Sequence, residues 1–302
     1  MEKHATFITA PKAGANSVAV TGPETIDFDK ITLTNDIMFS SVFHDPEYCR
    51  ELLQRILDIE ITELEISEDQ KSIRVKPWHK GIRLDIYVKD INGNVYDIEM
   101  QVFNAGDLPL RSRYYHSEMD SYQILRGQDY IELKASIVIF LCSFDLFGQN
   151  RSIYTFQSLC REDPDISLKD NRQTIFVNIE GDRTGLSPEL ISFLDYLKTT
   201  EPTDDFTTSL NSKVKRLRND LDWRENYMTL ERKMEERFKA GIEVGREQGI
   251  ELGREQGKAQ TLKDMTLKKL AKGKSIPQIA EECEESIETI QFLITEMERE
   301  NS

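Results

Sequence analysis

The sequence GIRLDIYVKDINGNVYDIEMQ, at residues 81–101, decides the fold of this chain. Apolar and polar residues alternate on both sides of a central Asn92-Gly93 pair, which is the pattern of two half-buried β-strands. Asn-Gly favours a type I′ turn, because both central residues of that turn need a positive φ. The pattern therefore predicts an antiparallel hairpin with strands at 82–88 and 95–102.

The polar residues of the two predicted strands share one face. Asp85 lies on the first strand, and Asp97, Glu99 and Gln101 alternate along the second. Pairing of the strands brings Asp85 and Glu99 together on one patch. Such hard oxygen ligands suit Mg²⁺, which binds through one or two carboxylates and keeps several waters. The alternative is a solvated hairpin face with ordinary surface acids.

This segment resembles the core of the PD-(D/E)xK phosphodiesterases, in a variant that carries Glu-x-Gln. More specifically, the chain resembles the Rpn family of recombination-promoting nucleases and transposases, over residues 31–298. Further stretches carry the resemblance, in this order: an Asp-x-x-Phe helix at 34–43, an Arg-x-x-Tyr helix at 110–115, a buried strand at 136–142 and a Gly-rich charged repeat at 241–257.

The resemblance implies a role for each residue of the predicted site. Asp85 and Glu99 match the acids that bind Mg²⁺ or Mn²⁺, and Asp36 matches an acid from the first helix that completes the site. Gln101 matches the position usually held by a catalytic Lys. A Lys carries a charge that steadies the phosphate, whereas Gln can only orient water or exchange hydrogen bonds. Lys80 and Arg83 are nearby cations that could substitute for the Lys.

Further residues are candidates to bind the substrate. Arg111 and Arg113 could grip backbone phosphates, Tyr115 could stack on a base or orient water, and Arg83 is a further candidate near the site. Tyr115 also falls in a helical stripe with Met119 and Tyr122, which favours packing against the sheet. Apolar packing does not explain an arginine at position 113, so Arg113 is the better functional candidate.

Composition sets the outer limits. The chain of 302 residues is long enough for one sizeable core and a smaller module. No apolar run reaches the roughly 18 residues of a membrane span, and the N-terminus lacks the features of a secretory signal. The four cysteines form no Cys-x-x-Cys pair, which favours reduced thiols in a cytoplasmic protein.

The formal net charge of −15 is unusual for a protein that binds DNA, because phosphate contacts draw on Lys and Arg. Local basic patches, such as residues 213–218 and 263–274, could supply the positive field. Alternatively, nucleic acid is not the main partner.

The chain divides into four predicted regions: a flexible arm at 1–28, a nuclease core at 29–210, a charged helix with the Gly-rich repeat at 211–262 and a small helical bundle at 263–302. In the core, the patterns predict helices from Asp45-Pro46, over about 109–128 and from Pro188, and strands at 59–66, 73–76, 136–144 and 174–179. The predicted fold is a mixed α/β sheet flanked by helices, with a helical C-terminal tail.

The tail allows two interpretations. Gly recurs at every fourth position from 241 to 257, and each Gly costs about 1 kcal/mol in a helix relative to Ala. The repeat is therefore either a surface for close pairing with another helix or a flexible, partly helical spacer. Residues 275–286 resemble a helix-turn-helix, but the Glu-rich helix that would read DNA repels phosphate. We expect the tail to mediate a homodimer or higher oligomer.

Together these features predict a Mg²⁺-dependent endodeoxyribonuclease that acts in recombination, mobile-element movement or defence. The main alternative is a catalytically inactive interaction protein that keeps the same fold, which the acidic charge and the absent Lys favour. A metal-dependent RNase is the third alternative. No membrane association is expected.

Overall fold

The computed structural model describes residues 26–66, 84–124 and 126–300. The chain divides into two compact units: the first ends at Arg224 and the second begins at Glu225. Most of the predicted arm at 1–28, the predicted strand at 73–76, Lys80 and Arg83 lie outside the described residues.

A six-stranded mixed sheet forms the centre of the first unit, in the order β1-β2-β3-β4-β6-β5. The middle strands β3, β4 and β6 run parallel to one another, while β1, β2 and β5 pair antiparallel with their neighbours. The bounds of the strands are β1 Leu64–Ile66, β2 Ile86–Asp90, β3 Val95–Gln101, β4 Ser136–Cys142, β5 Ile153–Gln157 and β6 Arg172–Asn178. Together with the flanking helices, this sheet confirms the predicted α/β fold class.

The predicted hairpin is present as β2 and β3, but its turn differs from the prediction. Of the loop residues Ile91, Asn92 and Gly93, only Gly93 has a positive φ, of 86°. The turn is closed by the Gly93 N–H, which donates to the carbonyl of Asp90 at 2.9 Å. The Asp90 carboxylate also accepts from the Asn92 and Asn94 N–H groups, both at 2.9 Å. This side chain stabilises a three-residue loop with one left-handed residue in place of the type I′ turn.

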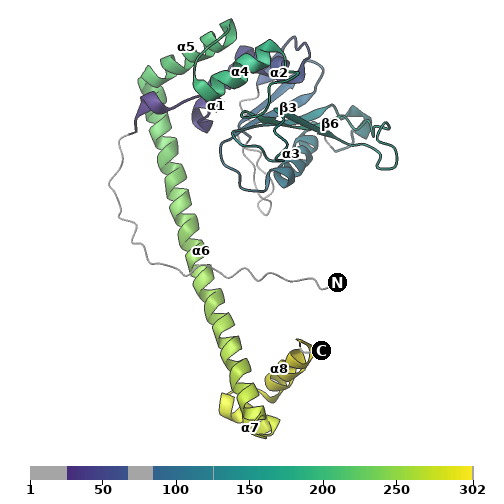
Figure 1. Cartoon of the computed structure of the whole chain (residues 1–302), viewed down its shortest axis with the longest axis vertical. Helices are drawn as coiled ribbons and strands as arrows, with labels where there is room; N and C mark the ends of the chain where they lie inside the picture. The colour runs from purple at the N-terminus through teal and green to yellow at the C-terminus, as the bar shows by residue number, and fades with distance from the viewer. Residues whose placement is uncertain (1–25, 67–83, 125, 301–302) are drawn as a thin grey trace. The chain divides into compact units, whose positions relative to one another are not determined.

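Helices cover both faces of the sheet (Figure 1). Helix α3 (Leu108–Gln123) packs Leu108, Tyr115 and Met119 against one face. Helices α1 (Asp36–Phe43), α2 (Pro46–Leu57) and α4 (Pro188–Thr199) lie on the other side. Phe43 of α1 meets Phe193 of α4 edge to face, with ring centroids 6.3 Å apart. The three predicted core helices are therefore present, and α3 ends five residues before its predicted limit.

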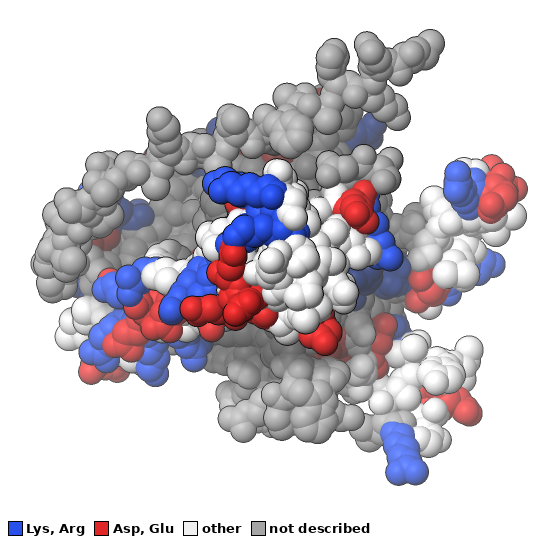
Figure 2. Space-filling view, turned by 90° about the horizontal axis from the view of Figure 1, so that it is seen from below, with Lys and Arg blue, Asp and Glu red and all other residues white. Residues whose placement is uncertain are grey.

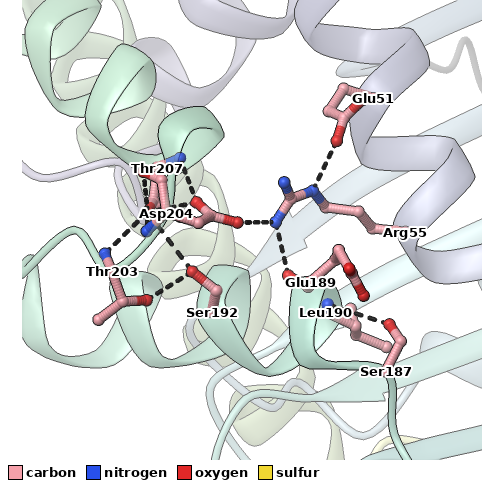
Figure 3. Close-up of polar contacts among 9 residues, drawn as sticks. All are labelled: Glu51, Arg55, Ser187, Glu189, Leu190, Ser192, Thr203, Asp204 and Thr207. Carbon is pink, nitrogen blue, oxygen red and sulfur yellow. Dashed lines mark hydrogen bonds and ion pairs between the residues drawn. The ribbon is translucent and has the colours of Figure 1, made fainter.

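Arg55 of α2 joins three helices into one layer (Figure 3). Its Nη1 donates to the carbonyl of Glu189 in α4 and to Oδ2 of Asp204, both at 2.6 Å, and its Nε donates to Glu51 at 3.0 Å. Asp204 is the N-cap of α5 (Asp205–Asn219) and accepts from the Thr207 N–H at 2.7 Å. One carboxylate thus caps a helix and holds a buried guanidinium.

One strand and one α-helix of this unit were not predicted. Strand β5 is an edge strand whose residues are half-buried or exposed, although Ile153, Tyr154 and Phe156 are residue types that favour strands. Helix α5 continues past residue 210, which was predicted to be the last residue of the nuclease core. Its Leu210 and Val214 are buried. Its start carries an Asp204–Thr207 capping box, a local signal that was available in the sequence.

The second unit contains the larger part of helix α6 (Leu221–Leu270) and two shorter helices, α7 (Ile276–Cys283) and α8 (Ile287–Glu300). All glycines of the repeat lie within α6, which continues as an α-helix through them. Ile279, Ala280 and Ile290 form a small core between α7 and α8, with Leu262 and Leu270 of α6 packed against it. Among the described residues, no helix is both long and apolar enough to cross a bilayer.

Candidate metal centre and catalytic site

Asp85 and Glu99 lie opposite each other across the β2–β3 pair. Ile86 is the register partner of Ile98, so the residue before β2 faces the residue after Ile98. The Asp85 N–H donates to Oε1 of Glu99 at 3.0 Å, and the Met100 N–H donates to Oδ2 of Asp85 at 3.3 Å. Each carboxylate is therefore held by the backbone of the other strand.

Helix α1 supports the same point of the hairpin. Ser40 Oγ donates to the carbonyl oxygen of Asp85 at 3.2 Å. Asp36 is the first residue of α1 and lies one turn before Ser40. Its carboxylate is exposed and accepts from the Ile37 N–H at 3.0 Å. Within the described chain, no hydrogen bond joins Asp36 to Asp85 or Glu99.

The acidic face of β3 is buried. Glu99 is 2% exposed and Asp97 is fully buried. In the parallel register, Asp97 and Glu99 pair with Val138 and Phe140 of β4, and both of these residues pack under α3. The alternative of a solvated hairpin face is therefore wrong, because α3 covers these acids.

Burial changes the protonation of both acids. Burial, with the negative charge of Asp85, raises the pKa of Glu99 from 4.5 to about 8, against the opposing effects of the Asp85 N–H and the Arg111 guanidinium. Burial also raises the pKa of Asp97 well above 3.8, and the charges of Glu99 and Asp85 raise it further. Neither oxygen of Asp97 has a hydrogen-bond partner among the residues that the structure describes. Acids held together in this way are stabilised by a proton or by a bound cation.

Gln101 and Arg111 complete the described site. Gln101 Nε2 donates to Oε2 of Glu99 at 3.4 Å. Arg111 Nη1 donates to Oε1 of Gln101 and Arg111 Nη2 donates to Oε2 of Glu99, both at 3.0 Å. The Tyr115 hydroxyl accepts from Arg111 Nη2 at 2.7 Å. From the sequence, Arg111 was a candidate for contact with a phosphate, and Arg113 was preferred; the contacts of Arg111 to Glu99 and Gln101 were not predicted. Its i,i+4 spacing to Tyr115, which puts both residues on one face of a helix, was the available signal.

The two predicted substrate-binding residues of α3 lie in different environments. Arg113 is exposed, two residues beyond Arg111. Tyr115 is 6% exposed, and its ring lies 6.2 Å from that of Phe140, measured between centroids. Tyr115 is thus a packing residue whose hydroxyl binds Arg111, while Arg113 faces solvent.

The donor set fits a divalent cation bound by two carboxylates. No group of three or more His, Cys, Asp or Glu side chains in the described ranges is arranged to hold a metal ion. Glu99 already accepts hydrogen bonds from Asp85, Gln101 and Arg111, and the Tyr115 hydroxyl also lowers its pKa, so little of its acceptor capacity is free. Mg²⁺ tolerates such a site, because it takes one or two carboxylates and fills its other positions with water and phosphate.

The predicted basic patches are partly neutralised within the protein. In the first patch, Lys213 pairs with Asp45 at 3.2 Å, and Arg218 Nε donates to the carbonyl of Ile31 at 2.7 Å. In the second patch, two lysines pair with the same Glu282. On the face drawn in Figure 2, Lys and Arg side chains lie among Asp and Glu side chains. The described residues drawn there form no single broad basic surface.

Comparison with known proteins identifies the family. Neither the curated proteins nor the solved structures give a match. A family model described as PD-(D/E)XK nuclease family transposase matches residues 34–243, more than half of the 302 residues. The matched range includes Asp36, the hairpin that carries Asp85 and Glu99, and helix α3. The chain therefore belongs to the PD-(D/E)XK nuclease family transposases.

Proposed function

We propose that this protein is a divalent-metal-dependent endonuclease that hydrolyses phosphodiester bonds in DNA. The observation that carries the proposal is the opposition of Asp85 and Glu99 on a buried polar face, beside Gln101 at the end of β3. Burying acids without full compensation costs folding free energy, so their presence under α3 is better explained by a function than by packing.

Each residue of the site has a proposed role. Asp85 and Glu99 hold the cation, and Asp36 assists from the exposed start of α1. Mg²⁺ or Mn²⁺ bound there would neutralise charge developing on the phosphate and lower the pKa of a bound water. Gln101 orients the attacking water through its amide. Arg113, exposed on the same helix as Arg111, contacts a backbone phosphate.

The family supports a role in DNA rearrangement. The matching family model is described as a nuclease family transposase, so cleavage in recombination, mobile-element movement or defence is the proposed cellular context. DNA is the proposed partner, and the cytoplasm is the proposed compartment. A homodimer or higher oligomer formed through α6 to α8 would bring two sites to the two strands of a duplex.

An inactive interaction protein remains the second candidate, because specific observations favour it. The net charge is −15, Gln101 replaces the usual Lys, and several basic side chains are paired internally. A metal-dependent RNase is the third candidate, since the same two carboxylates serve either nucleic acid.

One assay separates the three candidates. The purified full-length protein is incubated with supercoiled plasmid and, separately, with single-stranded RNA, in Mg²⁺, Mn²⁺ or EDTA. Nicked or linear plasmid that forms only with a metal supports the proposal. Cleavage of RNA alone identifies an RNase, and no cleavage of either substrate with either metal favours the inactive protein.

A further inference from the structure

We propose that Arg111 is a positioning residue of this site, which supplies from helix α3 the positive charge that the nuclease motif usually places on the strand at position 101. The inference rests on the proposed nuclease function and deepens it. On this inference Gln101 and Arg111 act as one pair, in which the arginine compensates for the Lys that is absent from position 101.

The two η nitrogens of Arg111 bind two residues of the site at once. Nη1 donates to Oε1 of Gln101 and Nη2 donates to Oε2 of Glu99, each at 3.0 Å. The guanidinium is planar and its N–H groups point in fixed directions, so it sets the distance between its two acceptors. Arg111 therefore fixes how Gln101 and Glu99 lie relative to each other.

The same contacts define the orientation of the Gln101 amide. Its Oε1 accepts from Arg111, and its Nε2 donates to Glu99 at 3.4 Å. The reversed amide would direct its NH₂ group at a guanidinium and its oxygen at a carboxylate. A Lys at position 101 could donate to Glu99 but could accept nothing from Arg111. Gln is thus the side chain that complements an arginine at this point.

Arg111 is itself held in place. The Tyr115 hydroxyl accepts from Arg111 Nε at 3.2 Å and from Nη2 at 2.7 Å. The guanidinium carbon lies 5.4 Å from the ring centroid of Tyr115 and 5.9 Å from that of Phe140. Only 28% of the Arg111 side chain is exposed. A side chain locked by one helix turn and one strand can position others, which the exposed Arg113 cannot do in the same way.

The test is a four-protein comparison of wild type, Gln101→Lys, Arg111→Gln and the double variant, all as full-length protein. For plasmid cleavage, Arg111→Gln is expected to lower kcat by roughly 10²-fold with little change in KM, in the range of a positioned group. Gln101→Lys is also expected to lower kcat, because it adds a second cation beside Arg111. The double variant has one cation again and should cleave faster than either single variant.

Calorimetric titration of the metal-free proteins with Mn²⁺ gives a readout without catalysis. A cation beside the metal site weakens metal binding by repulsion. Gln101→Lys should therefore bind Mn²⁺ about tenfold more weakly, Arg111→Gln should bind at least as tightly as wild type, and the double variant should lie near wild type. In Arg111→Gln, Glu99 keeps its contacts to the Asp85 N–H and to Gln101. Weaker Mn²⁺ binding by this variant would therefore mean that Arg111 holds the metal ligand rather than supplying charge beside it, which would overturn the proposal.

Controls keep the result interpretable. Arg126→Gln removes the same charge from an exposed position beyond α3 and should change neither measurement. Thermal unfolding checks that each variant folds, and if Arg111→Gln does not, Arg111→Lys and the double variant carry the test. A double variant that cleaves no better than its parents overturns the proposal. If wild type cleaves nothing, the nuclease function fails, while the Mn²⁺ titrations still decide whether the charge at 111 acts on the site.

Discussion

The two faces of strand β3 are equally buried but chemically opposite. Tyr96, Ile98 and Met100 alternate with the acids along the strand and so lie on the face opposite α3, and each is at most 5% exposed. Asp97 and Glu99 point under α3 and are equally hidden from solvent. The first face stabilises the fold through apolar burial. The acidic face lowers the stability of the fold. The apolar face of β3 therefore serves the fold, whereas the acidic face serves the proposed function.

The largest expected effect on stability comes from the apolar face. Ile98→Ala removes buried methyl groups from a fully buried position at the middle of the sheet. The free energy of unfolding should fall by about 3 kcal/mol, which chemical denaturation would measure. A loss below about 1 kcal/mol would mean that this face is not the tightly packed layer described here.

Gln101→Ala tests the polar face at its open end. The substitution removes the amide, which accepts from Arg111 and donates to Glu99. In our proposal the same amide orients the attacking water. The cleavage rate should fall by roughly 10²-fold, while the midpoint of thermal unfolding changes little because Gln101 is only partly buried. Full activity in this variant would show that Gln101 takes no part in the reaction.

Asp97→Asn tests whether the polar face costs stability. The folded-state pKa of Asp97 is raised by burial, so above pH 4 the unfolded chain ionises this group before the folded protein does. Wild-type stability is therefore full below the unfolded pKa and falls as the pH rises toward the folded value. The Asn variant lacks this loss and should be more stable at pH 7, by about 1–3 kcal/mol. Its advantage should vanish below about pH 4. A variant that is less stable at pH 7 would mean that the Asp97 carboxylate has a stabilising partner.

Deletion of residues 240–302 should have the smallest effect on the site. The removed part contains most of α6 with its Gly-rich repeat, α7 and α8, and none of the sheet. We expect light scattering to report a smaller oligomer, while Mn²⁺ binding by the remaining protein is unchanged. An unchanged oligomeric mass together with a loss of DNA affinity would contradict the proposed role of the tail.

Local patterns were sufficient to predict the hairpin and the fold class. Strict alternation and an Asn-Gly pair defined β2 and β3, and with them the opposition of Asp85 and Glu99. The type of turn was wrong, because the Asp90 side chain stabilises a longer loop. The burial of Asp97 and the contacts of Arg111 depend on how α3 packs on the sheet. That packing is long-range and leaves no periodic signal in the strand itself.

The most direct test of the central claim, that Asp85 and Glu99 form one metal site, is to measure plasmid cleavage by the Asp85→Ala variant. The backbone contacts of Asp85 to Glu99 and Ser40 survive the substitution, so the variant should fold, with a thermal midpoint close to that of wild type. The matched control is Glu65→Ala, which removes an exposed acid from the neighbouring strand β1. We predict that Asp85→Ala loses metal-dependent cleavage of supercoiled plasmid, while the control cleaves normally. Cleavage by Asp85→Ala at the wild-type rate would contradict the account.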